Sequence, residues 1–225
     1  EQEFEISFEA PIVGAFYGEL LKELTDKNRI REIIPEAATQ KVTAWDLGMS
    51  DSTAIWVAEI ISGEVRVMDF YEASGESLDH YIKWLDEKGY RDYTHIMPHD
   101  VNVRELQTGK SRYQFLTEAG LDIEVAPKSS VEDGIQAVRR VLPNCWFNKD
   151  KTRAGVECLQ NYRRVFNEKT SSFQNRPLHD WSSHAADAFR YLALGMDSTG
   201  NGQRTDWSKP FETTLDGDSY KDYYV

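Results

Sequence analysis

Residues 41–71 read KVTAWDLGMSDSTAIWVAEIISGEVRVMDFY, and this stretch decides the fold. In its first part, 41–46, Val42, Ala44 and Asp46 alternate with Thr43 and Trp45. This period of two is typical of a β-strand. A second run, 53–61, is rich in β-branched and aromatic residues, and the turn Ser62-Gly63 separates it from a third run, 64–71. Three successive strands with short links predict an antiparallel meander.

The rest of the chain alternates between helical and strand-like patterns. Hydrophobic spacing and stop signals predict helices over 78–89, 112–119, 130–142, 152–167 and from 180 or 182 to about 195, and strands over 93–97, 121–125 and 145–147. A meander followed by such alternation predicts an α/β fold, in which parallel strands extend a mixed sheet flanked by helices. Sheets of this kind usually bind ligands at the carboxyl ends of their strands.

The chain is long enough for one sizeable hydrophobic core, and we place the main domain in residues 41–196. Residues 1–40 are interpreted as a lead-in with one short helix over 17–27, and residues 197–225 as an acidic, mostly irregular tail. The net charge of −12 is concentrated in these two flanking segments. The acidity therefore leaves DNA possible as a substrate, but it predicts weak binding, because Lys and Arg supply most non-specific affinity for DNA.

Several protein classes are excluded by absences in the sequence. No apolar run approaches the roughly 18 residues of a membrane span, and the first residues lack the pattern of a signal peptide. Cys145 and Cys158 have no metal-binding spacing and are interpreted as reduced, partly buried thiols, which suits a cytosolic protein.

Three aspartates lie where a chain of this fold could hold a divalent metal. Asp46 ends the first strand, Asp100 follows the 93–97 strand, and Asp187 lies in the last predicted helix. Carboxylate oxygens on rigid elements are the ligands that Mg²⁺ and Mn²⁺ prefer, and two such ions can cleave a phosphodiester. We therefore predict a metal-dependent nuclease. Three gathered carboxylates repel one another, so at least one should have a raised pKa without metal.

Two further residues are candidates for supporting roles at this site. Asp51 follows the glycine turn after Asp46 and could act as an auxiliary ligand, and His184 shares a helical face with Asp187. The alternatives are ordinary: aspartates that cap turns, and an exposed His184–Asp187 pair worth only tenths of a kcal/mol.

Basic residues near the same loops are candidates for contacts with DNA phosphates. Lys128 lies just before the helix at 130–142 and is either a phosphate contact or a solvated surface charge. The other candidates are Arg104, Lys110 and Arg112.

Four motifs, at 44–55, 98–100, 127–135 and 179–191, together resemble the C-terminal nuclease domain of the large terminase subunit of tailed double-stranded DNA bacteriophages. The resemblance spans about 42–195, and residues 8–17 resemble that family's connector from its ATPase domain. It implies an RNase H-like fold and two-metal endonuclease action on double-stranded DNA concatemers during genome packaging. It also implies Asp46, Asp100 and Asp187 as catalytic metal ligands, with Asp51 and His184 as auxiliary residues.

The resemblance also implies partners. These are the ATPase domain of the same parent chain, the small terminase subunit and the procapsid portal, in the host cytoplasm. This chain contains no Walker A motif, so it should cut DNA without hydrolysing ATP.

Two alternatives stay open. An ATPase or phosphotransferase of the actin and sugar-kinase type also places an Asp-x-Gly loop after a first strand, but it needs a second half and a second Gly-rich loop. The other alternative is a docking domain with an inactive nuclease site. Metal-dependent nicking of a plasmid separates both from the nuclease.

Overall fold

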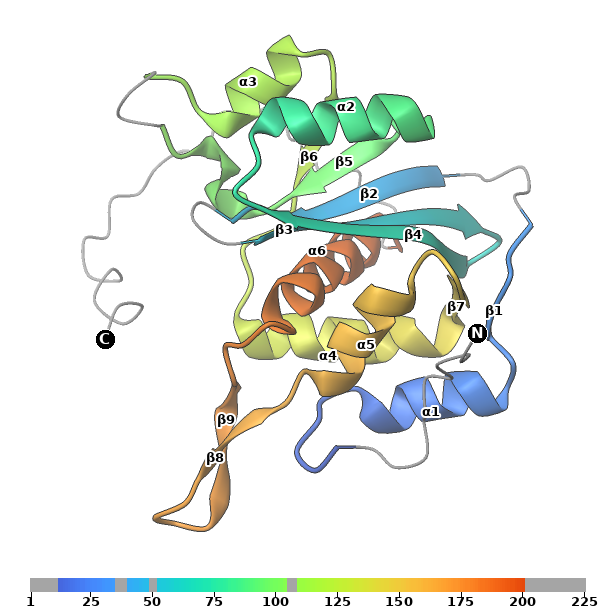
Figure 1. Ribbon diagram of the computed structural model, residues 1–225, viewed down its shortest axis with the longest axis vertical. Helices are drawn as coiled ribbons and strands as arrows, with labels where there is room; N and C mark the ends of the chain where they lie inside the picture. The colour runs from blue at the N-terminus through green and yellow to red at the C-terminus, as the bar shows by residue number, and fades with distance from the viewer. Residues whose placement is uncertain (1–11, 35–39, 49–51, 105–108, 201–225) are drawn as a thin grey trace, which may run out of the picture.

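A seven-stranded mixed sheet divides the helices into two layers (Figure 1). The computed structural model describes residues 12–34, 40–48, 52–104 and 109–200, with side chains described as far as Met196. Its strands run in the order β1-β7-β4-β3-β2-β5-β6. Their bounds are β1 Ile30–Arg31, β2 Gln40–Asp46, β3 Ser52–Ile61, β4 Glu64–Ser74, β5 Thr94–Met97, β6 Asp122–Val125 and β7 Cys145–Asn148.

The predicted meander is confirmed. Strands β2, β3 and β4 pair antiparallel, with Ala44 opposite Trp56 and Trp56 opposite Phe70. The outer strands β5, β6, β7 and β1 add in parallel. The predicted α/β class with a mixed sheet is therefore correct, and β2 lies in its interior between β3 and β5.

One face of the sheet is covered by α1, α4, α5 and α6 (Figure 1). Helix α6 contacts the sheet closely because its inner face is made of small residues: a Cβ added at Gly195 would lie 2.8 Å from the Ile96 side chain. The indole of Trp56 donates a hydrogen bond of 2.7 Å to the carbonyl of Ala185 at the start of this helix. Such close packing fixes α6 against the ends of the strands. The helices span α1 Gly18–Asp26, α2 Leu78–Lys88, α3 Arg112–Glu118, α4 Val131–Val141, α5 Arg153–Asn161 and α6 Ser183–Gly200.

The opposite face carries a second core under α2 and α3. Trp45 and Met97 point from the sheet into this core and meet Tyr81 and Leu85 of α2. Because successive side chains of a strand point to opposite faces, Asp46 is directed to the α6 side when Trp45 faces α2. Short 3₁₀ helices, η1 at His99–Asn102 and η2 at Leu142–Asn144, complete the connections.

The helix predicted over 152–167 is wrong in its second half. Helix α5 ends at Asn161, and the chain turns extended at Tyr162. It then forms a hairpin of β8, Arg164–Asn167, and β9, Ser172–Pro177, which projects from the body (Figure 1). Phe166 fits the hydrophobic spacing of a helix, but its ring contacts Phe173 across the hairpin.

Other differences concern the ends of elements. The two-residue strand β1 was not predicted, and α6 continues to Gly200 rather than ending near Gly195. The rest of the predicted tail, 201–225, and the first part of the lead-in, 1–11, lie outside the described residues. Among the helices that are described, none combines the length and the apolar character needed to cross a bilayer.

Candidate active site

The carboxyl ends of two neighbouring strands bring the first two predicted aspartates to one edge of the sheet. Strands β2 and β5 are parallel, with Val42 opposite Thr94 and Ala44 opposite Ile96. Asp46 is the last residue of β2, and Asp100 lies in η1 directly after β5. Helix α6 packs against both strands, and its His184 reaches Asp46 at this edge.

Asp46 is paired with a histidine of α6. His184 Nδ1 lies 3.1 Å from Asp46 Oδ2, and the side chains are only 15% and 20% exposed. Burial raises the pKa of Asp46, the hydrogen bond from His184 lowers it, and the nearby charge of Asp187 raises it. The pKa of Asp46 is thus raised, as predicted for one of the carboxylates, but burial is the largest cause and repulsion from Asp187 is a smaller one.

Asp187 is held by two side chains that were not predicted. Tyr162, the residue that follows α5, donates a hydrogen bond of 3.4 Å to Asp187 Oδ1. Arg190, one turn along α6, places Nε 3.2 Å and Nη2 2.7 Å from the same oxygen. Asp187 is therefore part of a hydrogen-bonded ion pair in a half-buried position.

Asp100 is exposed on η1, which begins two residues after β5 ends. Burial raises the pKa of the Tyr191 hydroxyl, and the charges of Asp46, Asp187 and Asp100 raise it further, whereas Arg190 lowers it. The elements that carry the three predicted aspartates are neighbours: β2 and β5 pair in parallel, η1 follows β5, and α6 packs against both strands.

The described residues do not include a ready-made metal cage. Among them, no three His, Cys, Asp or Glu side chains are arranged as a group that could hold a metal ion. Asp51, the predicted auxiliary ligand, lies outside the described residues. A second imidazole, that of His179, lies with its ring centroid 5.8 Å from that of His184.

One of the predicted DNA-binding residues, Arg112, contacts the chain next to Asp46. Arg112 Nη1 donates a hydrogen bond of 3.3 Å to the carbonyl oxygen of Leu47, the residue after Asp46. Lys128 is exposed on the segment that follows β6, and Arg104 is exposed opposite Ser111. Lys110 forms an ion pair of 2.6 Å with Glu118, so part of its charge is already compensated.

Sequence reasoning missed Arg190, Tyr162 and Tyr191 as members of the site. Arg190 follows Asp187 by three residues, a spacing that places the two side chains side by side on a helix. That spacing was a usable signal for the pair. Tyr162 gave none, because its position depends on the end of α5 and on the hairpin that follows.

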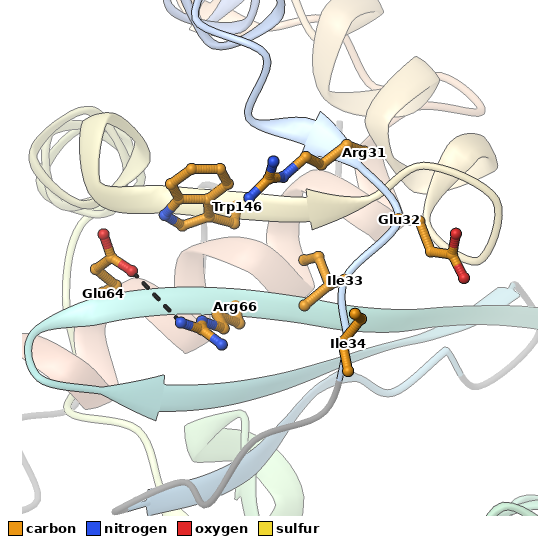
Figure 2. A pocket seen from close by; sticks show the side chains of 7 residues that line it. All are labelled: Arg31, Glu32, Ile33, Ile34, Glu64, Arg66 and Trp146. Carbon is orange, nitrogen blue, oxygen red and sulfur yellow. Dashed lines mark ion pairs between the residues drawn. The ribbon is translucent and has the colours of Figure 1, made fainter.

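A cavity of about 270 Å³ lies elsewhere, between β1, β7 and β4 (Figure 2). Its wall includes Trp146, which neighbours the core residue Phe147 on β7 and therefore points to the other face of the sheet. In the same wall, Arg66 Nη2 of β4 lies 3.8 Å from Glu64 Oε2. None of the predicted site residues lines this cavity, so we place the chemistry at the edge that holds the partly buried Asp46 and its partner His184. Its other lining residues are Arg31, Glu32, Ile33 and Ile34.

Comparison of the fold with solved structures gives large terminases and their nuclease domains. The large terminase of a thermophilic bacteriophage matches with a TM-score of 0.61 and 16% identity, over 79% of this chain and 45% of that one. The P22 large terminase nuclease domain matches with a TM-score of 0.58 and 15% identity, over 76% of this chain and 89% of that one. The large terminase nuclease of another thermophilic phage, G20c, with bound magnesium, matches with a TM-score of 0.55 and 11% identity, over 81% and 98%.

These matches establish that the chain has the fold of large terminase nuclease domains, the RNase H-like fold predicted from the sequence. The match covers less than half the length of the first of these terminases but nearly all of the isolated nuclease domains. No protein-family model matches the sequence, and neither does any curated protein sequence.

Proposed function

We propose that this chain is a divalent-metal-dependent endonuclease domain that cuts double-stranded DNA concatemers during packaging of a phage genome. One observation carries the proposal: Asp46 at the end of β2 contacts His184 of α6, the helix that holds Asp187, and Asp100 follows the neighbouring parallel strand β5. The fold shared with terminase nuclease domains supports it, and the G20c nuclease is known with bound magnesium and with bound cobalt.

The residues present fit a hard divalent cation. The donors are carboxylate oxygens, the ligands that Mg²⁺ and Mn²⁺ prefer, and burial and repulsion already raise the pKa of Asp46. A bound cation would relieve both effects by favouring the ionised carboxylate. We assign Asp46, Asp100 and Asp187 as its ligands, with Asp51 as an auxiliary acid.

Two ions, when bound, would supply an activated water and would stabilise the leaving oxygen of the phosphodiester. The protein's own side chains do the positioning. The hydrogen bond from His184 fixes one oxygen of Asp46, and Tyr162 and Arg190 fix one oxygen of Asp187.

We propose that DNA approaches along the edge that carries Arg112, Lys128 and Arg104. Arg112 lies nearest to Asp46, through its contact with Leu47, while Lys110 contributes less because it is paired with Glu118. The net charge of −12 makes DNA binding by this chain alone weak and salt-sensitive. Because the match covers under half of the large terminase with the TM-score of 0.61, the ATPase domain, small subunit and portal are proposed as partners of the whole parent protein.

The test is a plasmid-cleavage assay on the purified chain. Supercoiled DNA should be converted to nicked and linear forms in Mn²⁺ or Mg²⁺, and EDTA should stop the reaction. ATP binding is measured in parallel, because the kinase-like alternative requires it. ATP binding without cleavage in any divalent ion would refute the nuclease and favour that alternative.

A further inference from the structure

Arg190 is a charged side chain buried beneath the aspartate site. The residue is only 8% exposed, yet burying an ion costs free energy unless a partner compensates its charge. Its guanidinium donates a hydrogen bond from Nε to Asp187 Oδ1 and forms an ion pair with the same oxygen through Nη2. The charges of these two residues therefore compensate each other inside the protein.

The surrounding structure leaves room for this pair. A Cβ added at Gly134 of α4 would lie 3.2 Å from Cδ and 3.5 Å from Nη1 of Arg190, so the glycine allows the side chain to pass. On the other side, Tyr162 contacts Asp187 and stacks on Tyr17 with ring centroids 5.8 Å apart. The Arg190 side chain therefore passes Gly134 of α4, and its partner Asp187 is also bonded to Tyr162.

Helix α6 thus supplies a partner to two of the three aspartates. His184, three residues before Asp187, pairs with Asp46, and Arg190, three residues after it, pairs with Asp187 itself. Positive or hydrogen-bonding partners of this kind favour the ionised form of two partly buried carboxylates that repel each other. An incoming divalent cation, however, would be repelled by the guanidinium already beside Asp187.

We propose that Arg190 is a built-in counter-cation of this site: it neutralises Asp187 without a divalent ion and opposes the binding of that ion. Arg190 is thus a positioning residue that acts through Asp187. The inference rests on the proposed function, since it concerns the same metal site. With Arg190 in place, the chain folds without metal but binds the metal less tightly.

The test is calorimetric titration of Mn²⁺ into the purified chain and its variants. Arg190→Gln removes the charge, so Mn²⁺ should bind about tenfold more tightly, within the usual range of coupling between two sites. Arg190→Lys keeps the charge and should bind as the wild type does. Unchanged or weaker binding by Arg190→Gln would overturn the proposal.

Arg139→Gln is the matched control. Arg139 is also a partly buried arginine near Tyr17, but its Nε and Nη2 donate to the carbonyl of Phe16, each at 3.3 Å. Its loss should lower stability and leave the affinity for Mn²⁺ unchanged. A tightening as large as that in Arg190→Gln would show a general loosening of the fold and would also overturn the proposal.

A second readout covers the case in which Arg190→Gln does not fold without metal. Circular dichroism during a Mn²⁺ titration should then show recovery of the folded state, because an ion that binds only the native state stabilises it. No recovery would count against the counter-cation. If the wild type neither binds Mn²⁺ nor cuts DNA, the proposed function itself fails; if it does both and Arg190→Gln binds no tighter, only the counter-cation fails.

Discussion

Replacing Asp46 with asparagine is expected to lower Mn²⁺-dependent DNA cleavage by at least about 100-fold, since even the loss of an outer-shell partner of a metal ligand costs 10–100-fold. The amide keeps the size of the side chain and its contact with His184, but it removes the negative charge that the cation needs. Cleavage of supercoiled plasmid at saturating Mn²⁺ gives the measurement. Wild-type rates in the variant would remove Asp46 from the site.

The same variant should not be unfolded, and its pH dependence shows why. Because the pKa of Asp46 is raised in the folded state, the folded protein holds this proton to higher pH than the unfolded chain. The stability that this provides is present at low pH and is lost as the pH rises through the raised pKa. Asparagine cannot ionise, so in metal-free buffer the variant should gain in melting temperature relative to the wild type as pH rises. A difference in melting temperature between variant and wild type that stays constant with pH, or that shifts in favour of the wild type as pH rises, would contradict this account.

Replacing Asp187 with asparagine should also abolish cleavage, but with a cost in stability. The change leaves Arg190 buried without its counter-charge, and removing one partner of a buried ion pair usually costs about 3–5 kcal/mol. Asparagine still offers an oxygen to the guanidinium, so we expect about 2 kcal/mol, or a melting temperature lower by roughly 4–8 °C. Thermal unfolding without metal measures this difference.

The double variant Asp187→Asn with Arg190→Gln provides the control for that interpretation. With the guanidinium gone, the asparagine at 187 should cost much less than it does in the wild-type background, so the two changes should be non-additive. Additive losses would show that Asp187 and Arg190 do not compensate each other.

The sequence predicted the elements whose residues follow a clear local period. The β2–β4 meander alternates with a period of two, and the polar face of α6 carries His184 and Asp187 as its helical spacing required. Asp46 and Asp100 could be placed because each follows a strand, and the ends of parallel strands share one edge of a sheet.

The features that were missed depend on contacts between distant segments. The β8–β9 hairpin was not predicted, because Phe166 fits the hydrophobic spacing of a helix. Its partner Phe173 lies beyond the turn of the hairpin. Strand β1 exists only through pairing with β7, more than a hundred residues later. The burial of Arg190 depends on Gly134 in another helix, which no local pattern around Arg190 reveals.

The most direct test of the central claim is a crystal structure of the chain grown with Mn²⁺, in which anomalous diffraction locates the ion. We predict density at the carboxyl ends of β2 and β5, with oxygens of Asp46, Asp100 and Asp187 about 2.0–2.3 Å from bound metal, the usual range for hard cations and oxygen ligands. Manganese bound elsewhere, such as beside Glu64 in the cavity of Figure 2, with none between these aspartates, would contradict the account.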